Sequence, residues 1–449
     1  MVQDFHLFDT PFSFFVIINW LYAIFCSWWL YDLFRNRRYL FIKPSIFLIS
    51  YTHLFFQWPL AIFAGYYENW LPNPYTMIVL VHGYVVFGLA GSVLSQEREA
   101  SRIWNAIHRY EWNKYSNTRI KTIFILAGIV FAVTAAYLSY VPITSTGLYA
   151  ILFSPDTSGV AREESLKLLD YGGLKYAYSI MSSSVVPLLA ALLTMQLLSD
   201  KENRKVLLVV PIVLVLIFAG ISVSLTGTRA GLFNMAIVVA FVVLWKRGLT
   251  VKPGTVIIII LAAISPAIFL SLLREGKEIG EFAKLYFTYL GYISNRAFLM
   301  PFHVGGWYIH HAQEYGVLGI GAFPKLAGLF GVGPLDGPNI IGLAYASRYY
   351  GLPVMESISA TAGYLFSSYG YIGIAALPLS LLGLWLTDVS ILVYRRLGGY
   401  ILIPCVASIS LATLMFVQSD YTVVWITHGF GTILLLSLVL TKIFQDRQS

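Results

Sequence analysis

The sequence predicts an all-α membrane protein that crosses the bilayer many times. Of its 449 residues, 58% are hydrophobic and only 12% are charged, and the mean hydropathy is +0.72. A soluble domain of this size could not cover its surface with so few charged side chains. Long apolar stretches recur along the chain, and basic residues flank them on alternate sides. We therefore expect one integral membrane domain covering residues 1–449.

A membrane-spanning helix needs roughly 20 mainly apolar residues, and about eleven stretches meet this requirement. They cover residues 13–31, 45–64, 75–94, 122–142, 177–198, 206–225, 231–245, 255–273, 370–393, 399–417 and 423–441. The segment 274–369 could hold a further pair of short or re-entrant helices, so the number of spans stays open.

Orientation follows from the charges. Most of the 30 lysines and arginines lie on one side of the predicted spans, which the positive-inside rule assigns to the cytoplasm. The N-terminus is then outside, the C-terminus is inside, and two long loops, 143–176 and 274–369, face outward. The second loop is rich in Tyr, Phe, Trp and Gly, unlike a disordered linker. We expect it to form helices that cap a cavity between the spans. The net charge of +8 follows from the basic inner loops and does not indicate a nucleic-acid partner.

A minority of the arginines lie on the outer face, where positive charge is disfavoured. Arg229 lies in the tight turn Thr226-Gly227-Thr228-Arg229-Ala230-Gly231, where the start of the next helix favours an anion. Its guanidinium could hold a phosphate with two hydrogen bonds, although an arginine that reaches lipid headgroups explains it equally well. Arg296 and Arg348 lie among apolar and aromatic neighbours, where a charge needs a partner. Arg274 lies at the end of a span, where a helix-end anchor is the simpler explanation.

Several groups on the same face could accept a proton during catalysis. They are His303, His310, His311, Glu314, Asp336 and Glu356. Glu356 is the first choice because it lies close to where the long loop re-enters the membrane, although a solvated carboxylate explains it as well. His310 and His311 are adjacent, so on a helix they point in different directions and cannot form a metal-binding pair. The sequence has no HExxH motif, no DxD motif and no cysteine cluster, so we expect no metal.

Three stretches of the C-terminal half carry a resemblance. SLTGTRAGLF resembles a glycine-serine/threonine-arginine-glycine turn between two spans, and NRAFLMPFHVGGWYIHHAQEYGVLGIGAF resembles a segment of arginine, proline and aromatic residues. ESISATAGYLFSSYGYIGIAALPLSLLG is similar to a glycine-rich re-entry ahead of the next span. In this order, over roughly residues 220–385 of the chain, they resemble the bacterial O-antigen (Wzy-type) polymerase family.

The resemblance implies a GT-C-like glycosyltransferase of the bacterial inner membrane, with its active site open to the periplasm and no metal or cofactor. Its substrates would be oligosaccharide repeat units on undecaprenyl diphosphate, as both donor and acceptor. Its other partners would be membrane lipid and a separate protein that regulates chain length. By this analogy Arg229, Arg296 and Arg348 would bind the diphosphate, and we add Arg274 from the same face. For catalysis we expect Glu356 and His303, and for the glycan Tyr349, Tyr364 and Trp307.

Two alternatives differ in chemistry. An O-antigen ligase, which transfers the glycan to lipid A core, shares the fold but carries a histidine-asparagine pair in the re-entry segment. The corresponding residues 359–363 contain no histidine, although His303 could substitute. A transporter or flippase of the lipid-linked oligosaccharide would favour charged residues within the spans and two similar halves. The sequence shows neither, so polymerase is the first interpretation, ligase the second and transporter the third.

Overall fold

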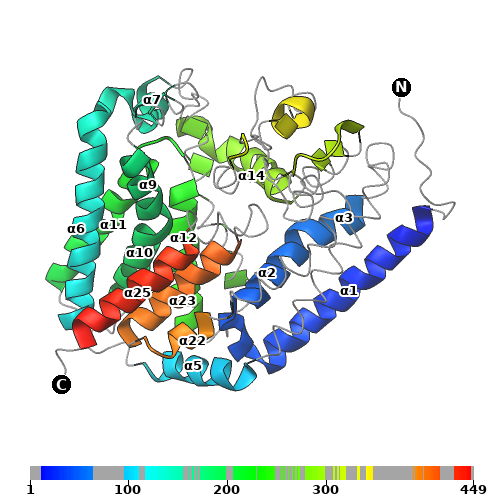
Figure 1. Ribbon diagram of the computed structural model, residues 1–449, viewed down its shortest axis with the longest axis horizontal. Helices are drawn as coiled ribbons and strands as arrows, with labels where there is room; N and C mark the ends of the chain where they lie inside the picture. Colours follow the sequence, from blue (N-terminus) through cyan, green and yellow to red (C-terminus); the bar gives the residue numbers. More distant parts are fainter. Residues whose placement is uncertain are drawn as a thin grey trace. The chain divides into compact units, whose positions relative to one another are not determined.

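The computed structural model confirms the all-helical class, since every regular element among the described residues is a helix (Figure 1). The structure describes residues 12–63, 96–110, 117–154, 161, 164–165, 168, 172–198, 206–228, 230–247, 254–255, 258, 261, 265, 268–269, 272–273, 279–298, 307–308, 311–312, 314–319, 331–333, 340–346, 388, 390–397, 399–414 and 429–445. The chain forms two compact units. Unit 1 comprises Met1–Glu97, Ser294–Val389 and Thr413–Thr422, and unit 2 comprises Arg98–Ile293, Ser390–Ala412 and Val423–Ser449.

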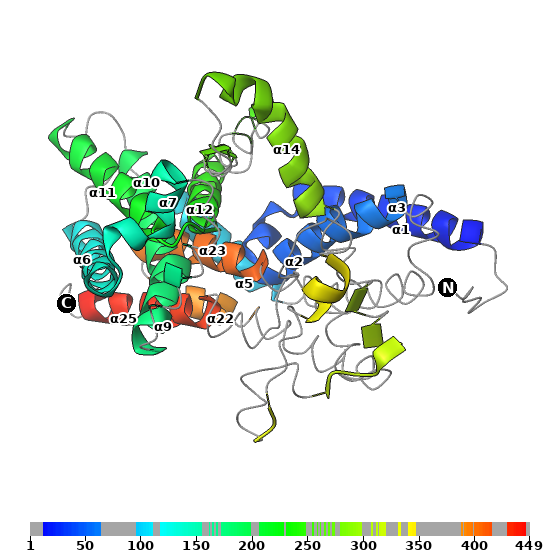
Figure 2. The same ribbon diagram turned by 90° about the horizontal axis from the view of Figure 1, so that it is seen from above.

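Unit 1 is organised around a helical hairpin. Its first arm is α1 (Phe12–Asn36), and after the 3-10 turn η1 (Arg38–Ile42) the second arm is formed by α2 (Pro44–Thr52), the π-helical turn η2 (His53–Gln57) and α3 (Trp58–Phe63). Pro44 suits the first position of α2, because the N–H that it lacks would have no partner in the helix. The two arms lie side by side in Figures 1 and 2, with α1 packed along η2 and α3.

A polar network joins the two arms of this hairpin. The imidazole Nε2 of His53 lies 2.8 Å from Ser27 Oγ on α1, and its Nδ1 lies 2.8 Å from Gln57 Oε1. The indole N–H of Trp58 donates to Ser27 Oγ at 3.1 Å. Because the Gln57 oxygen can only accept, the Nδ1 of neutral His53 carries the proton and its Nε2 accepts from Ser27. Such bonds join apolar helices where hydrophobic burial alone gives little preference.

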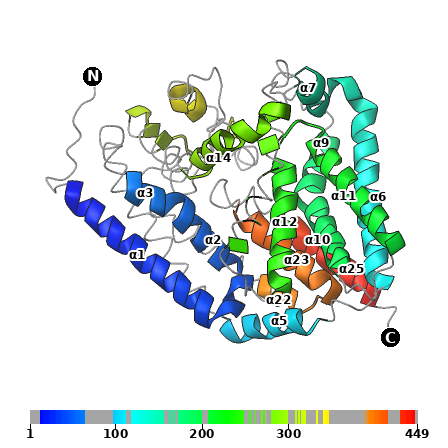
Figure 3. The same cartoon turned by 180° about the vertical axis from the view of Figure 1, so that it is seen from behind.

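Unit 2 is a bundle around one buried helix. Its main helices are α6 (Asn117–Tyr140), α9 (Gly172–Ile180), the π-helical turn η6 (Met181–Val185), α10 (Val186–Leu197), α11 (Val206–Ser224) and α12 (Ala230–Lys246). Every residue of α10 from Val186 to Gln196 is buried. The helix packs against α6, α11 and α12, which surround it in Figure 3. This bundle fixes the ends of α11 and α12, where the turn with Arg229 lies in the sequence.

The remaining helices complete the described parts. They are α5 (Glu97–Arg109), η4 (Ile143–Ser145), α7 (Gly147–Phe153), η8 (Ile279–Glu281), α14 (Phe282–Phe298), the π-helical turn η10 (Gly342–Ala346), α22 (Ser390–Tyr394), α23 (Gly399–Leu414) and α25 (Phe430–Gln445). The helix α14 lies within 274–369, so this segment contains helix as expected.

A glycine allows the helix α25 to pack closely within unit 2. Gly429, directly before α25, has φ +91°, a conformation that side chains rarely adopt. A Cβ atom there would lie only 2.8 Å from the carbonyl oxygen of Ser183 in η6. The π-helical turn and the glycine therefore allow the two backbones to approach closely.

Two helices are long and apolar enough to cross a membrane by length and composition, within the part of the chain that the structure describes. They cover Asn117–Tyr140 and Gly173–Leu197, and four shorter apolar helices cover Val209–Ser224, Ala230–Lys246, Tyr400–Thr413 and Phe430–Phe444. All six coincide with spans expected from the sequence. The expected span 75–94 and most of 370–393 lie outside the described residues. The number of spans and their orientation stay predictions.

Candidate functional site

The turn between α11 and α12 is the best-defined part of a predicted site. Its residues Ser224, Leu225 and Thr226 are buried, and Thr226 is only 1% exposed. The N–H of Gly227 donates to the carbonyl of Ser224 at 2.7 Å, and Gly227 has φ +74°. This left-handed conformation strongly favours glycine. The hydroxyls of Thr226 and Thr228 lie 3.1 Å apart. The chain therefore reverses in a single, tightly bonded geometry just before α12.

The start of α7 is docked against this turn. The N–H of Leu148 donates to the carbonyl of Leu225 at 3.0 Å. A Cβ atom on Gly147 would lie 2.6 Å from the carbonyl carbon of Thr226 and 2.8 Å from the nitrogen of Gly227, with the Thr226 oxygen closer still. The segment 143–176, which is expected to face outward, thus contributes a glycine that lets its backbone touch the backbone of the turn.

Two further contacts fix the helices on either side of the turn. The buried phenol of Tyr178 in α9 donates to the carbonyl of Ser222, near the end of α11, at 2.6 Å. A Cβ atom at Gly231 would lie 2.6 Å from Val223 Cβ, so this glycine allows α12 to start close to α11. Both glycines of the Thr226–Gly231 motif are explained by packing. The backbone on either side of position 229 is held by α7, α9 and α11.

This arrangement suits an anion chemically. The first N–H groups of a helix have no partners within it, and the positive end of the helix dipole lies there. The helix α12 extends over 17 residues, long enough for this effect. Arg229 itself lies outside the described residues. Its proposed contact with a phosphate stays a prediction, and it would act beside the helix N-terminus.

A second set of candidate residues lies in the described pieces of the segment 274–369. The ring of Trp307 stacks on that of Tyr345, with centroids 6.2 Å apart and planes 12° from parallel. His311 lies edge-on to Tyr345 at 6.0 Å and next to Tyr315 at 4.9 Å. Trp307 is only 5% exposed. Trp307, one of the three residues expected to bind the glycan, therefore belongs to an aromatic cluster. Within this cluster its side chain is buried.

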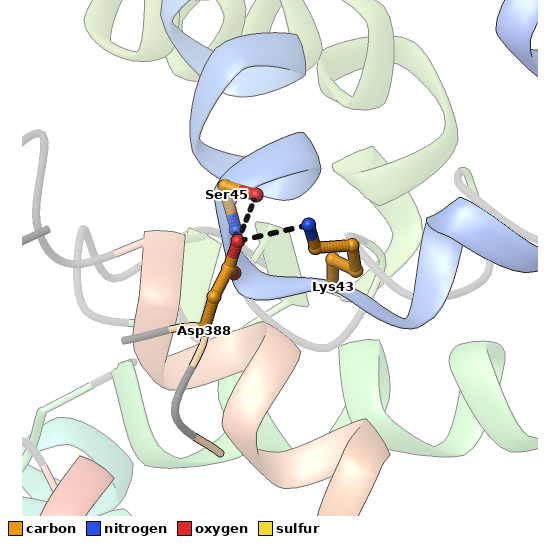
Figure 4. Close-up of polar contacts among 3 residues, drawn as sticks. All are labelled: Lys43, Ser45 and Asp388. Atoms are coloured by element: carbon orange, nitrogen blue, oxygen red, sulfur yellow. Dashed lines mark hydrogen bonds and ion pairs between the residues drawn. The ribbon is translucent and has the colours of Figure 1, made fainter. Parts of the chain in front are cut away.

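Unit 1 also contains a buried ion pair that the sequence did not reveal (Figure 4). The ammonium of Lys43 lies 3.2 Å from the carboxylate of Asp388, and the two side chains are 0% and 1% exposed. The same carboxylate accepts from the backbone N–H of Ser45 at 3.1 Å and from its hydroxyl at 2.8 Å. Burial lowers the pKa of Lys43 below its usual value, and the charge of Asp388 opposes this shift.

The ion pair has a structural explanation. Ser45 lies in the first turn of α2, whose N–H groups have no partners within the helix, and Asp388 serves as their cap from a distant segment. Lys43 neutralises the carboxylate that does so. We interpret the three residues as a clamp between α2 and the segment before α22. A charged residue buried near a predicted span otherwise suggests transport, but here the carboxylate is bonded on both oxygens.

The other predicted site residues divide into two groups. Only the backbone of Arg296 is described, and it lies in the last turns of α14. Outside the described residues lie Arg229, Arg274, Arg348, Glu356, His303, Tyr349 and Tyr364. The expected convergence of the arginines on one diphosphate stays a prediction. No group of three His, Cys, Asp or Glu side chains suited to a metal ion occurs where the structure describes the chain.

Sequence reasoning missed Gly147, Tyr178 and Tyr345. Thr146-Gly147 does carry a local signal, since Thr146 caps α7 by accepting from the N–H of Tyr149 at 3.2 Å. Nothing in that signal reveals that the glycine touches Thr226, 79 positions later. The stack of Trp307 and Tyr345 likewise joins residues without a common motif.

No protein-family model, curated protein or solved structure matches this chain. The resemblance to O-antigen polymerases therefore rests on the three sequence stretches.

Proposed function

We propose that this protein is an integral membrane glycosyltransferase that polymerises oligosaccharide repeat units carried on undecaprenyl diphosphate. It acts at the periplasmic face of the bacterial inner membrane and releases undecaprenyl diphosphate. The product is O-antigen or a related surface polysaccharide. In this proposal the chain has about eleven spans, a periplasmic N-terminus and a cytoplasmic C-terminus, and the segments 143–176 and 274–369 face the periplasm.

The proposed reaction needs no metal and no nucleotide sugar. A hydroxyl of the acceptor repeat unit attacks the anomeric carbon of the donor glycan, and the bond from that carbon to the diphosphate oxygen breaks. The hydroxyl proton passes to a base, for which Glu356 is the first candidate and His303 the second. The electron pair leaves with the diphosphate, whose charge is stabilised by Arg229 and the other outer arginines Arg274, Arg296 and Arg348. The lipid anchors keep both substrates at the membrane surface.

The observation that carries the proposal is the locked turn before α12. Gly147, Gly227 and Gly231 bring three backbone segments into contact there. A rigid turn directly before position 229 suits a site in which Arg229 presents a fixed charge, and fixed charge is what stabilises a leaving anion. A guanidinium that only snorkelled to lipid headgroups would not require this degree of fixation.

The proposal is tested by reconstitution. Purified protein in detergent receives undecaprenyl-diphosphate-linked repeat units, and the products are followed by glycan length and by released undecaprenyl diphosphate. Wild-type protein should lengthen the glycan. Arg229→Ala should lower the rate about 10²–10³-fold, the loss typical of removing one group that stabilises a developing anion. Arg229→Lys should fall between the two, because an ammonium lacks the two-pronged geometry.

Arg247→Ala is the matched control, because Arg247 directly follows the opposite end of α12. It should retain wild-type activity. Transfer of the glycan to lipid A core would assign the protein as a ligase, and movement of the lipid across the bilayer without a new glycosidic bond would assign it as a transporter. Full activity of Arg229→Ala would remove this arginine from the site. A Glu356→Gln variant tests the base in the same assay, since unchanged activity there would leave His303 as the remaining candidate.

A further inference from the structure

The aromatic cluster in the outer segment has a supporting side and an exposed side. Trp307 and Tyr345 stack on each other, and Trp307 is buried. Tyr315 is 72% exposed, although its ring lies 4.9 Å from that of His311. His311 in turn lies edge-on to Tyr345. The buried pair therefore supports His311, and His311 supports the exposed ring of Tyr315.

The spacing of these residues explains why each ring lies next to the following one. Trp307, His311 and Tyr315 are four residues apart, so helical turns place them on one face. Gly316 follows with φ +86°, which ends the helical turn directly after Tyr315. The ring of Tyr315 thus lies at a chain reversal. Its neighbour among the described aromatic rings is His311, and most of the Tyr315 side chain stays exposed.

Polar groups lie next to the exposed ring. Glu314 is exposed beside it in the sequence, and the imidazole of His311 lies 4.9 Å from the ring centre with its plane tilted by 33°. Burial raises the pKa of the Tyr345 phenol above its usual value, and the nearby charge of Glu314 raises it further. Tyr345 therefore stays a neutral phenol at physiological pH, and the carboxylate is close enough to act on the cluster. The chain offers an aromatic face, a carboxylate and an imidazole together.

These three groups suit a sugar ring. One face of a pyranose carries C–H groups that pack by dispersion on an aromatic ring, and its hydroxyls donate to carboxylates and exchange hydrogen bonds with imidazoles. Specific small-molecule sites usually combine an aromatic surface with a few placed polar groups. An anionic lipid headgroup is a poorer fit, because Glu314 would repel it.

We propose that Tyr315 is the stacking platform of a sugar-binding subsite, with Glu314 and His311 as its hydrogen-bonding groups. The subsite takes one pyranose ring of a glycan. That this glycan is the donor or the acceptor repeat unit rests on the proposed function. Trp307 supports the platform from behind and does not itself contact the sugar.

Binding can be measured without polymerisation. Full-length protein in detergent is titrated with the methyl pyranosides of glucose, galactose, mannose and N-acetylglucosamine, and saturation-transfer NMR reports which sugar protons contact the protein. At least one pyranoside should show saturable transfer to the C–H protons of one face. Tyr315→Ala should weaken its binding about tenfold, and Tyr315→Phe should leave it unchanged because stacking does not need the hydroxyl.

Controls separate stacking from folding. Tyr140→Ala removes another exposed tyrosine, in α6, and should change nothing. Trp307→Ala should lower the thermal unfolding temperature, whereas Tyr315→Ala should not. The proposal is overturned if no pyranoside shows saturable transfer, or if Tyr315→Ala binds as tightly as wild type. A spin label at Tyr315→Cys in lipid nanodiscs that is more accessible to oxygen than to a water-soluble nickel complex would place the ring in lipid and overturn it as well.

The outcomes also distinguish this subsite from the enzymatic proposal. Saturable, Tyr315-dependent sugar binding by a protein that cannot lengthen the glycan would refute the polymerase and leave the subsite standing. A polymerising protein whose KM for the repeat unit is the same in wild type and Tyr315→Ala would refute the subsite alone.

Discussion

Replacing Gly147 by alanine should disable the proposed site without touching any charged residue. The new Cβ would lie 2.6 Å from the Thr226 carbonyl carbon and 2.8 Å from the Gly227 nitrogen, whereas ordinary contacts of this kind start at 3.4 Å. All of these neighbours are backbone atoms, which no rotamer change can move aside. The turn must therefore shift by several tenths of an ångström to about 1 Å.

The cost has two components. Overpacking of a tightly packed contact typically destabilises a protein by about 1–3 kcal/mol, which should lower the thermal unfolding temperature by a few degrees. A displacement of about 1 Å at a reacting group can lower a rate about 10²-fold. Because the turn directly precedes position 229, we expect the loss of polymerisation rate to exceed what the lost stability explains at the assay temperature.

Gly173→Ala in α9 is the matched control, since a Cβ there meets nothing within 4 Å. It should keep the wild-type rate and unfolding temperature. The assay compares glycan lengthening and thermal unfolding for the two variants and wild type. If Gly147→Ala matches Gly173→Ala in both measurements, then α7 does not brace the turn, and the reasoning about the locked turn is wrong.

Three other predictions follow from the described contacts of unit 1. Lys43→Met alone or Asp388→Leu alone should lower the free energy of unfolding by about 3–5 kcal/mol, because each leaves a buried charge unpaired. The double variant should recover most of this loss in chemical unfolding. An equal loss in all three variants would contradict the clamp. Because burial lowers the pKa of Lys43 below 10.5, the unfolded chain binds this proton more tightly. The stability of wild type relative to Lys43→Met should therefore rise as the pH increases from the lowered value towards 10.5, and a falling difference would refute this. His53→Leu should lower the free energy of unfolding by about 1–3 kcal/mol, since Ser27 and Gln57 lose their shared partner, and Ser27→Ala should lower it by about 1 kcal/mol. If His53→Leu leaves the thermal unfolding temperature unchanged, the network does not hold the two arms of the hairpin together.

The sequence was most informative about helices. Hydropathy placed the segments 122–142, 206–225 and 231–245 within a few residues of α6, α11 and α12, because apolar length alone decides such elements. Hydropathy did not reveal a detail inside another expected span. The expected span 177–198 contains the π-helical turn η6, against which the backbone at Gly429 packs closely.

The sequence was less informative about the site, for a physical reason. The motif around Arg229 signalled a turn and a charge, and the structure confirms the turn. Its glycines are explained by partners that no local pattern names, such as Gly147 in a preceding loop. Asp388 and Ser45, which it bonds beside Lys43, are 343 positions apart along the chain, so this contact too has no local signal in the sequence. Contacts of this kind depend on the tertiary fold.

The packing of α25 against η6 has a consequence for the synthesis of the protein. The turn η6 precedes α25 by a long stretch of sequence, so η6 is synthesised well before the helix that packs against it. A chain truncated before Phe430 would leave Ser183 and Ser184 without their helical neighbour, and these hydroxyl-bearing residues would face solvent or lipid. Deleting Phe430–Gln445 should therefore destabilise unit 2 as a whole, and not only the segment that is removed.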